Sequence, residues 1–544
     1  MKKLINIWRI LAALISGALL AFCYPKFNVG AFIWIWPVPL LLALWTLKSK
    51  KRKYLRGFGL GYLSGLIFFL INLSWLHHIH FIACLLLSFF LAGYFAIWGG
   101  FAATIGVPKK DVSTLAESNS YFSLKAAFLN GSAWCGLEWV RGWLLTGFPW
   151  NGLGVGLAND LVMVQTADII GVTGISFILI FCSTIITSLL LRLPYEIRNS
   201  SLKAHPDFIV GVTLIIIIFF YGTHRLTEFS EDEEIEIRTL LVQGGINQDE
   251  KWNPESAKKI YKRYWDMTTP YLKLQEANFD LVVWPESSLP YSLHDRQTQT
   301  YLNKILSIDD YELVLGLNER IPQEGIYNSI IKLRNNSTNY SSYRKTHLVP
   351  FGEYVPFRKS IPFIEKIAAN SLGVDFQPGD KLYPLDMELP EPYQIIPLVC
   401  FEDTFGSLAR EFISNSPQLI INVTNDGWFK QSAASEQHFI NSIFRCIELR
   451  RPMIRCANTG MSCLIDDCGS LYDRSLRHQG AERLIYGKER SNTFITGTLP
   501  ETIRIKKTPK ITLYARFGDS FSISLGMIAL LTLCFRIFKT LRKN

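Results

Sequence analysis

The ten cysteines of this 544-residue chain include no CxxC pair. Because zinc sites rich in cysteine are usually built from such pairs, a zinc site is not expected. Cys463 and Cys468 lie close enough in sequence to pair in an oxidising compartment. Two unpaired, packed thiols are the preferred interpretation, since spacing alone does not provide disulfide geometry.

Charged residues are also scarce, at 19% of the chain against 49% for hydrophobic residues. This balance is unusual for a soluble protein, and the apolar residues concentrate in the first 222 positions, which predicts a chain of two parts with one part in lipid. The net charge of +10 does not indicate nucleic acid as a partner. The basic residues form short clusters beside apolar stretches, at 48–56 and 536–543, and no nucleic-acid motif accompanies them.

Long apolar segments predict helices that cross a membrane, each of which needs about 20 largely apolar residues. The first segment lacks a convincing small-residue cleavage site and is followed at once by further spans, so we interpret it as a retained helix and not as a signal peptide. The expected spans are about 4–22, 31–47, 58–76, 81–105, 123–145, 163–191, 207–222 and 519–538.

Lysine and arginine lie almost entirely on one side of these predicted spans. They occur at Lys2 and Lys3, in the 48–56 loop, at Lys109 and Lys110, and at Arg192, Arg198 and Lys203, whereas the alternate loops carry almost none. Because positively charged loops stay in the cytoplasm, seven crossings place residues from about 223 to 518 outside it. The eighth span returns the basic C-terminus to the inside.

Two polar groups in the predicted spans allow either a functional or a structural interpretation. Glu138 and Arg141 lie three residues apart on one helical face and are expected to pair, as a structural ion pair or as part of a lipid or substrate cavity. His77, His78 and His80 have no nearby acidic or cysteine partner. They are interpreted as interfacial side chains at a helix end in preference to a metal site.

From about residue 236, short β-branched runs alternate with amphipathic helices, a pattern typical of a layered α/β domain. Asn253 and Pro254 predict the N-cap and first turn of a helix after the first strand. This helix should bury Ile260, Tyr264, Met267, Tyr271 and Leu274 on one face. The predicted buried strands are 237–243, 281–284, 313–317, 395–399 and 419–423.

Three segments carry residues suited to nucleophilic catalysis. Glu286 follows a strand in VVWPESSLP, Cys400 ends a strand in IIPLVCFEDTF, and Lys345 lies in YRKTHLVPFGEYVPF. A cysteine between a strand and a helix meets partial positive charge, which favours the thiolate. Taken singly, the three residues also fit a solvated carboxylate, a packed thiol and a surface lysine.

In this order and with these neighbours, the three segments resemble the Glu, Lys and Cys triad segments of the nitrilase superfamily. NVTNDGWF at 422–429 is similar to its strand and loop after the nucleophile. The chain most resembles a membrane-bound branch, the apolipoprotein N-acyltransferase family, although Phe401 stands where that family often has tyrosine, and Thr424 and Gly427 vary the loop. The resemblance covers nearly the whole chain and includes EWVRGWLLTGFPWNGLG, VQGGINQDEKW, HLVPFGEYVP, FRCIELRRPMIRCANTG and TLYARFGD.

The resemblance implies an integral membrane α-helical bundle of about eight transmembrane helices carrying an α/β nitrilase-like domain, an α-β-β-α sandwich. The expected divisions are 1–222 for the first seven helices, 223–236 for a linker, 237–512 for the catalytic domain and 513–544 for the last helix and cytoplasmic tail. Together with the charge distribution, it implies a multi-pass protein of the bacterial inner membrane whose catalytic domain faces the periplasm.

The implied reaction moves an acyl chain from a phospholipid, through a thioester on Cys400, to the N-terminal diacylglyceryl-cysteine amine of apolipoproteins. This would be the final step of lipoprotein maturation. Glu286 would act as the base and Lys345 would stabilise the oxyanion. The implied partners are the phospholipid donor, the diacylglyceryl-apolipoprotein acceptor and membrane lipids. This chemistry requires no metal or organic cofactor.

Further residues match supporting positions of the family. Glu353 and Glu402 would orient Lys345 or shape the site, although either could be an ordinary carboxylate that accepts hydrogen bonds in a loop. Trp252 and Trp428 are substrate-side candidates that could also simply pack against the domain. Residues 366–379, which contain Gly373, Pro378 and several small side chains, could form a mobile lid.

Two other functions use the same residues or the same architecture. A membrane-tethered amidase or lipid hydrolase would employ the same triad with water as the second nucleophile, and residue spacing does not separate it from a transferase. A non-catalytic membrane binding or transport protein with a degenerate domain is disfavoured by the intact Glu286, Lys345 and Cys400. The many spans favour transfer between lipid substrates, because a long-chain thioester must be kept from water.

Overall fold

The computed structural model describes residues 2–48, 52–109, 112–201, 203–228, 233–251, 254–274, 278–335, 340–356, 375–472, 481–485 and 493–542. The chain forms two compact units. The first comprises Met1–Glu228 and Arg516–Asn544, and the second comprises Phe229–Ala515.

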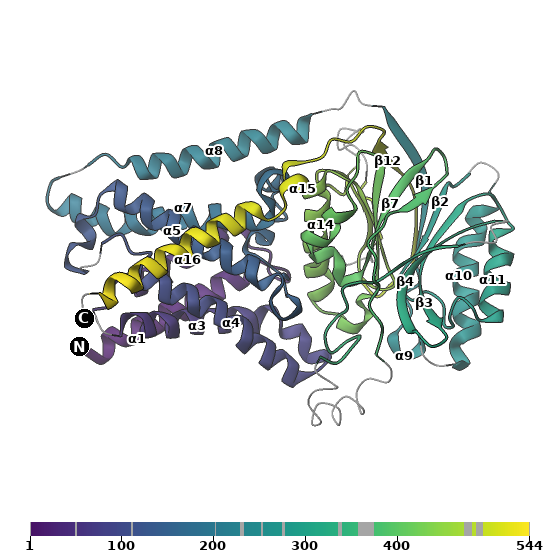
Figure 1. Cartoon of the computed structure of the whole chain (residues 1–544), viewed down its shortest axis with the longest axis horizontal. Helices are drawn as coiled ribbons and strands as arrows, with labels where there is room; N and C mark the ends of the chain where they lie inside the picture. Colours follow the sequence, from purple (N-terminus) through teal and green to yellow (C-terminus); the bar gives the residue numbers. More distant parts are fainter. Residues whose placement is uncertain are drawn as a thin grey trace. The chain divides into compact units, whose positions relative to one another are not determined.

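The first unit is helical (Figure 1). Five of its helices, α3, α4, α7, α8 and α16, are long and apolar enough to cross a membrane. The other three expected spans are helical as well, but α1 starts with charged residues, α2 is short, and α5 carries Lys125, Glu138 and Arg141, so a total of eight crossings stays a prediction. The helices are α1 Lys2–Ala21, α2 Pro37–Trp45, α3 Lys53–Asn72, α4 Phe81–Thr104, α5 Ser120–Arg141, α6 Leu161–Val164, α7 Ala167–Arg198, α8 Pro206–Thr227 and α16 Ser520–Leu541.

The last helix, α16, packs against α5 although the two are far apart in sequence. A Cβ atom at Gly526 would lie 3.0 Å from the Cα atom of Gly136. Small residues permit this close approach of helix backbones, as is common in membrane bundles.

The predicted pairing of Glu138 with Arg141 is wrong. Glu138 Oε1 instead accepts a hydrogen bond of 2.7 Å from the backbone N–H of Leu153, because the chain after α5 folds back over the helix end. The Arg141 guanidinium lies 5.9 Å from the centroid of the Phe69 ring, and within the described ranges no ion pair joins Arg141 to Glu138. The predicted position of His80 at a helix end is confirmed, since it caps α4.

The second unit contains two six-stranded sheets with the orders β12-β1-β2-β3-β4-β5 and β11-β10-β9-β8-β7-β6. In each sheet three neighbouring strands are parallel, β1-β2-β3 and β7-β8-β9. The strands are β1 Glu234–Gln243, β2 Leu281–Trp284, β3 Glu312–Ile321, β4 Gly325–Arg334, β5 Ser341–Arg344, β6 Leu385–Met387, β7 Tyr393–Val399, β8 Gln418–Thr424, β9 Met453–Ala457, β10 Ser462–Ile465, β11 Leu484–Ile485 and β12 Gly497–Lys506.

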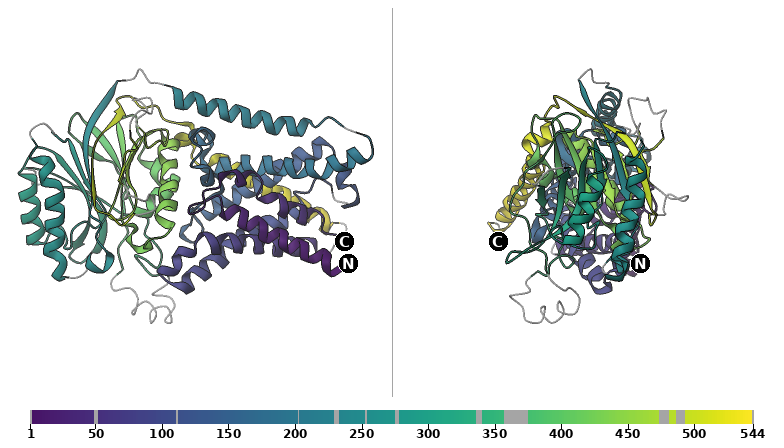
Figure 2. Two further views of the ribbon diagram at one scale, coloured as in Figure 1. Left: turned by 180° about the vertical axis from the view of Figure 1, so that it is seen from behind. Right: turned by 90° about the vertical axis from the view of Figure 1, so that its right-hand side faces the viewer.

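Helices connect the parallel strands and cover the outer faces of both sheets. Helices α10 (Ala257–Leu272) and α11 (Arg296–Leu306) lie on the first sheet, and α14 (Ala434–Leu449) lies on the second. Strands from the two sheets contact each other, β4 with β7 and β1 with β9. The four layers of this unit, helix, sheet, sheet and helix, can be followed in Figures 1 and 2, and they confirm the expected α-β-β-α sandwich.

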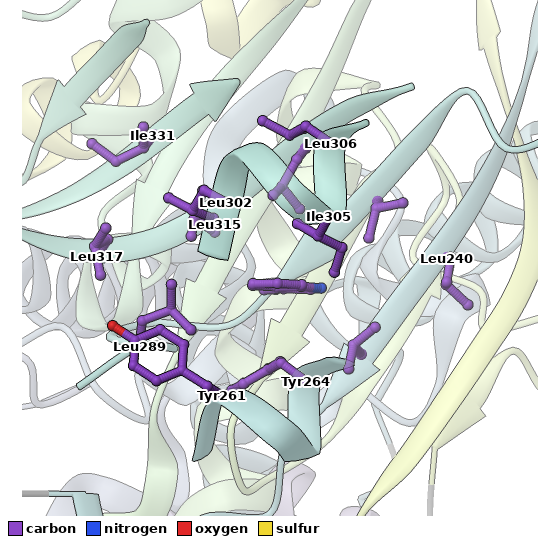
Figure 3. Packing of buried hydrophobic residues seen from close by; sticks show 14 of the residues in the cluster. Leu240, Tyr261, Tyr264, Leu289, Leu302, Ile305, Leu306, Leu315, Leu317 and Ile331 are labelled. Atoms are coloured by element: carbon purple, nitrogen blue, oxygen red, sulfur yellow. The ribbon is translucent and has the colours of Figure 1, made fainter. Parts of the chain in front are cut away.

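The core beneath α10 and α11 is formed by apolar side chains that recur on one face of each element (Figure 3). Tyr264 of α10 stacks at a tilt on Trp284 of β2, with ring centroids 4.8 Å apart. Ile260 and Tyr264 are buried as predicted, but Leu274 is exposed because α10 ends at Leu272. Residues Pro254–Ser256 form a short 3-10 turn before α10.

Candidate active site

Glu286 is held at the end of β2 by a close approach to β3. The backbone N–H of Ser288 donates to the Gly316 carbonyl oxygen at 2.9 Å, and that of Gly316 donates to Pro285 at 3.2 Å. A Cβ atom at position 316 would collide with the Glu286 backbone, so this position requires glycine. Ser287 has a φ of 47°, which turns the chain and leaves the Glu286 side chain buried.

Asn328, on β4, links the two carboxylates of the site. Its Nδ2 donates to Glu286 Oε1 at 2.6 Å and to Glu353 Oε1 at 2.9 Å. Burial, followed by Glu353, raises the pKa of Glu286, and the charge of Lys345 opposes this rise. Asn328 was not predicted as a site residue, because it lies on β4, a partly exposed strand with a mixed polar sequence.

Lys345 follows β5 and is fully buried. Its backbone N–H donates to the Asn328 carbonyl at 2.8 Å, and its Nζ forms an ion pair of 2.8 Å with Glu353 Oε2. Burial alone would lower the pKa of Lys345, but the surrounding negative groups, Glu353 foremost, outweigh it and raise that pKa. Lys345 is therefore a permanent cation at neutral pH.

Cys400 ends β7 in a left-handed conformation with a φ of 53°, and Asn422 Nδ2 donates to its carbonyl oxygen at 3.1 Å. Burial and then Glu286 raise the pKa of the Cys400 thiol well above its ordinary value, although Lys345 opposes the effect. The expected bias toward thiolate is therefore wrong. The chain after Cys400 forms only a five-residue 3-10 turn, Cys400–Thr404, whose small dipole does not offset burial, so the resting thiol needs a base.

Glu402, in this turn, connects the Cys400 segment to the Lys345 segment. Its Oε2 accepts from the backbone N–H of Val399 at 2.9 Å. Its Oε1 accepts from the backbone N–H groups of Thr346 at 2.8 Å and His347 at 3.0 Å, and from the hydroxyls of Tyr343 and Thr346. One carboxylate thus fixes the strand end that carries the thiol against the residues that follow the lysine.

A second buried charge cluster lies behind the nucleophile turn. His438, on α14, donates from Nδ1 to Asp426 at 2.8 Å and from Nε2 to Asp403 at 2.9 Å. Arg455 NH2 lies 3.4 Å from Asp426 Oδ2. Burial alone would lower the pKa of His438, but Asp403 and Asp426 outweigh it and raise that pKa to about 9. The imidazolium therefore ties α14 to the ends of β7 and β8.

Lys251 is a further buried cation that was not predicted as a site residue. Its Nζ donates to the backbone carbonyl oxygen of Glu286 at 3.0 Å. Its only sequence signal was its place beside Trp252, in a segment rich in charged residues. Trp252 itself and residues 366–374 of the candidate lid lie outside the described residues, and Trp428 is 51% exposed.

The structure thus brings together a buried carboxylate, a thiol and an ammonium group from three strand ends. Glu286, Lys345 and Cys400 influence one another's pKa, while Glu353 and Glu402 bond to the lysine or its segment. Such a set can deprotonate the thiol and stabilise an oxyanion. All ten cysteines lie in the described residues and none forms a disulfide, so the preference for two packed thiols at Cys463 and Cys468 is confirmed.

Each of the two units contains a segment that matches a known protein family. Residues 16–185 match the family model of the apolipoprotein N-acyltransferase N-terminal domain, and residues 241–489 match that of the carbon-nitrogen hydrolases. A carbon-nitrogen hydrolase structure from Helicobacter pylori G27 is 16% identical and covers 43% of this chain and 83% of its own, with a TM-score of 0.33.

Two curated relatives extend across most of the chain. The apolipoprotein N-acyltransferase of Geobacter metallireducens is 30% identical over 468 residues, covering 85% of this chain and 86% of that protein. The apolipoprotein N-acyltransferase of Shewanella oneidensis is 28% identical over 502 residues, covering 86% and 88%. The similarity spans the helical unit as well as the nitrilase-like unit, and the chain belongs to the apolipoprotein N-acyltransferase family.

Proposed function

We propose that this protein transfers an acyl chain from a membrane phospholipid to the N-terminal diacylglyceryl-cysteine amine of apolipoproteins, through a thioester on Cys400. The observation that carries the proposal is the convergence of Glu286, Lys345 and Cys400 in a chain with five helices able to cross a membrane. A hydrolase of soluble substrates has no need of such helices. A donor and an acceptor that are both anchored in lipid do need a membrane-bound enzyme.

In the first half-reaction, Glu286 takes the proton of the Cys400 thiol, and the thiolate attacks the ester carbonyl carbon of the phospholipid. Lys345 and backbone N–H groups near Phe401 stabilise the tetrahedral oxyanion. The carbon–oxygen bond then breaks, Glu286 returns the proton to the departing alkoxide, and lysophospholipid leaves. The raised pKa of Glu286 suits a group that must both accept and return a proton.

In the second half-reaction, the amine of the diacylglyceryl-cysteine attacks the thioester carbonyl carbon. Glu286 takes the proton released by the amine, the carbon–sulfur bond breaks, and Glu286 passes this proton to the departing Cys400 thiolate. The product is an amide. Glu353 orients Lys345 through its ion pair, Glu402 holds the two segments together, and Trp252 and Trp428 contact substrate.

The proposed location is the bacterial inner membrane, with the nitrilase-like unit in the periplasm. The basis is the concentration of basic residues in alternate loops. The test uses single cysteines introduced at Ser49 and at Lys258, with Cys400 and Cys534 replaced by serine. A membrane-impermeant thiol reagent added to spheroplasts should label position 258 and not position 49, and the reverse labelling would reject this orientation.

The reaction is tested with the purified protein in phospholipid vesicles and a synthetic diacylglyceryl-cysteine peptide. Mass spectrometry should find the peptide heavier by one acyl chain joined as an amide, and lysophospholipid in equal amount. Free fatty acid with an unmodified peptide would indicate a lipid hydrolase and reject the transferase.

A further inference from the structure

Lys251 is a buried lysine with no part in the reaction as written above. It ends the short helix α9 (Gln248–Lys251), and its side chain is 2% exposed. Its Nζ donates to the carbonyl oxygen of Glu286 at 3.0 Å. The bond therefore reaches the backbone of the residue whose side chain is the proposed base.

An ammonium group without a carboxylate partner is costly to bury. Two other buried cations of this unit have such partners, Lys345 with Glu353 and Arg445 with Glu448. Lys251 makes no ion pair with any side chain that the structure describes. Two of the three ammonium hydrogens are not used by the Glu286 bond.

The charges around Lys251 explain why a cation is buried there. Lys345 is the stronger positive influence on Glu286 but is also paired with Glu353, and Lys251 adds a second positive charge beside these two carboxylates. The charges of Glu286 and Cys400 influence the pKa of Lys251. The charges of Lys345, Glu353 and Lys251 influence the pKa of Glu286. Those of Glu286, Lys345 and Asp426 influence the pKa of Cys400.

We propose that Lys251 is a positioning residue of the reaction centre, which holds the turn that carries Glu286 and adds to Lys345 a second positive charge that favours the ionised form of Glu286. The inference rests on the proposed function of Glu286 as the base for Cys400. It adds a second positive charge to that of Lys345, and both charges favour the carboxylate form that a base requires.

This role predicts that the rate of Cys400 acylation falls on both the acid and the alkaline side of its pH profile. Without the Lys251 charge, the pKa values of Glu286 and Cys400 rise, so the acid limb of Cys400 acylation moves to higher pH. Burial lowers the pKa of Lys251 itself to about 8, although Glu286 and Cys400 oppose the effect. The wild-type rate should therefore fall as the pH rises through about 8, when the lysine loses its proton.

The test compares K251M, K251R and the matched control K258M, whose lysine is exposed on α10. Two rates are measured against pH in the full-length protein in vesicles: acylation of Cys400 by phospholipid, and alkylation of Cys400 by iodoacetamide. In K251M both profiles should move up by about 1 unit or more, the range expected for loss of a nearby opposite charge. K251R should keep the acid limb and lose the fall above pH 8, and K258M should match the wild type.

Equal loss of rate at every pH in K251M would make Lys251 a structural residue only and overturn the inference. If K251M does not fold, a fall above pH 8 that persists in K251R overturns it as well. Alkylation needs no donor lipid, so a shifted alkylation profile in a protein that never becomes acylated would count against the proposed function and leave the role of Lys251 standing.

Discussion

The two buried carboxylates beside Cys400 differ in how many hydrogen bonds their side chains accept. Glu402 accepts five, three of them from backbone N–H groups. The Glu286 side chain accepts a single hydrogen bond, from Asn328, among the described residues. Both carboxylates are buried, and burial raises the pKa of each.

This difference separates a group that fixes geometry from a group that can react. A carboxylate has about four lone-pair sites, so Glu402 cannot accept a proton without giving up bonds that position Lys345 and Cys400. Glu286 has acceptor capacity to spare and can take a proton at small structural cost. Four predictions test whether reactivity and positioning are divided in this way.

The largest effect is expected from removal of the nucleophile that both carboxylates serve. Cys400→Ser should leave no acyl-enzyme detectable by intact-protein mass spectrometry after incubation with phospholipid, because a serine hydroxyl is far less acidic than a thiol. Cys446→Ser and Cys456→Ser are the matched controls and should still be acylated. An acylated Cys400→Ser protein, or an inactive Cys456→Ser protein that folds normally, would mean that the nucleophile is another residue.

Removal of the proposed base or of the oxyanion-stabilising cation should reduce the rate of Cys400 acylation nearly as much. Glu286→Gln cannot accept the thiol proton, and Lys345→Met removes the cation facing the oxyanion. Lys345→Met should slow Cys400 acylation about 100-fold to 1,000-fold, the usual cost of one oxyanion donor. Glu286→Gln should slow it about 100-fold to 10,000-fold, the usual contribution of a general base. A Glu286→Gln enzyme that is acylated at the normal rate and stalls at amine transfer would restrict Glu286 to the second half-reaction.

Glu402→Gln should instead behave as a loss of positioning. Its amide group replaces one acceptor with donors, which leaves buried N–H groups unsatisfied at a cost of about 1 to 3 kcal/mol in the free energy of unfolding. The thermal unfolding midpoint should fall, and acylation should slow by about 10-fold, the effect of a misplacement worth about 1.4 kcal/mol in the barrier. Unchanged stability with a rate as low as that of Glu286→Gln would erase the distinction between the two carboxylates.

The smallest effect on catalysis is expected at His438, which bonds both Asp403 and Asp426. Because its pKa is raised from 6.5 to about 9, its contribution to stability is complete below about pH 6.5 and is lost as the pH rises through 9. The free energy of unfolding of the wild type should therefore decrease over this window by about 3 kcal/mol, since one pKa unit corresponds to about 1.4 kcal/mol. The thermal unfolding midpoint should fall with it. In His438→Gln the thermal unfolding midpoint should depend less steeply on pH over this window. An equally steep pH dependence in this variant would show that another group causes it.

The parts of the fold that could be predicted from the sequence are those with continuous apolar strands. The five predicted strands are all found, as β1, β2, β3, β7 and β8, because parallel strands covered on both faces need apolar side chains throughout. The residues after β2 and β7 could be predicted as site candidates for the same reason, since an apolar run that stops at a polar residue marks a strand end. Lys345 depended on the resemblance, because β5 is short and polar.

The remaining features depend on contacts that residue order does not show. Asn328 lies in the middle of a mixed polar strand, and Lys251 lies in a run of charged residues that is typical of an exposed loop. The pairing of Glu138 with Arg141 was predicted from helical spacing alone, which takes no account of the backbone N–H of Leu153. The thiolate bias at Cys400 failed because the length of the following turn and the degree of burial are tertiary properties.

The pairing of β1 with β12 bears on how the protein is made. Ten residues of the first strand pair with ten residues near the C-terminal end of the domain, from Glu234 with Lys506 to Gln243 with Gly497. During translation the edge of β1 that pairs with β12 therefore stays unpaired until almost the whole chain has left the ribosome. Unpaired strand edges can form hydrogen bonds with strands of other chains. Truncated products that end before Gly497 should accordingly be recovered as aggregates or as substrates of quality-control proteases, even though every residue of the candidate site has already been synthesised.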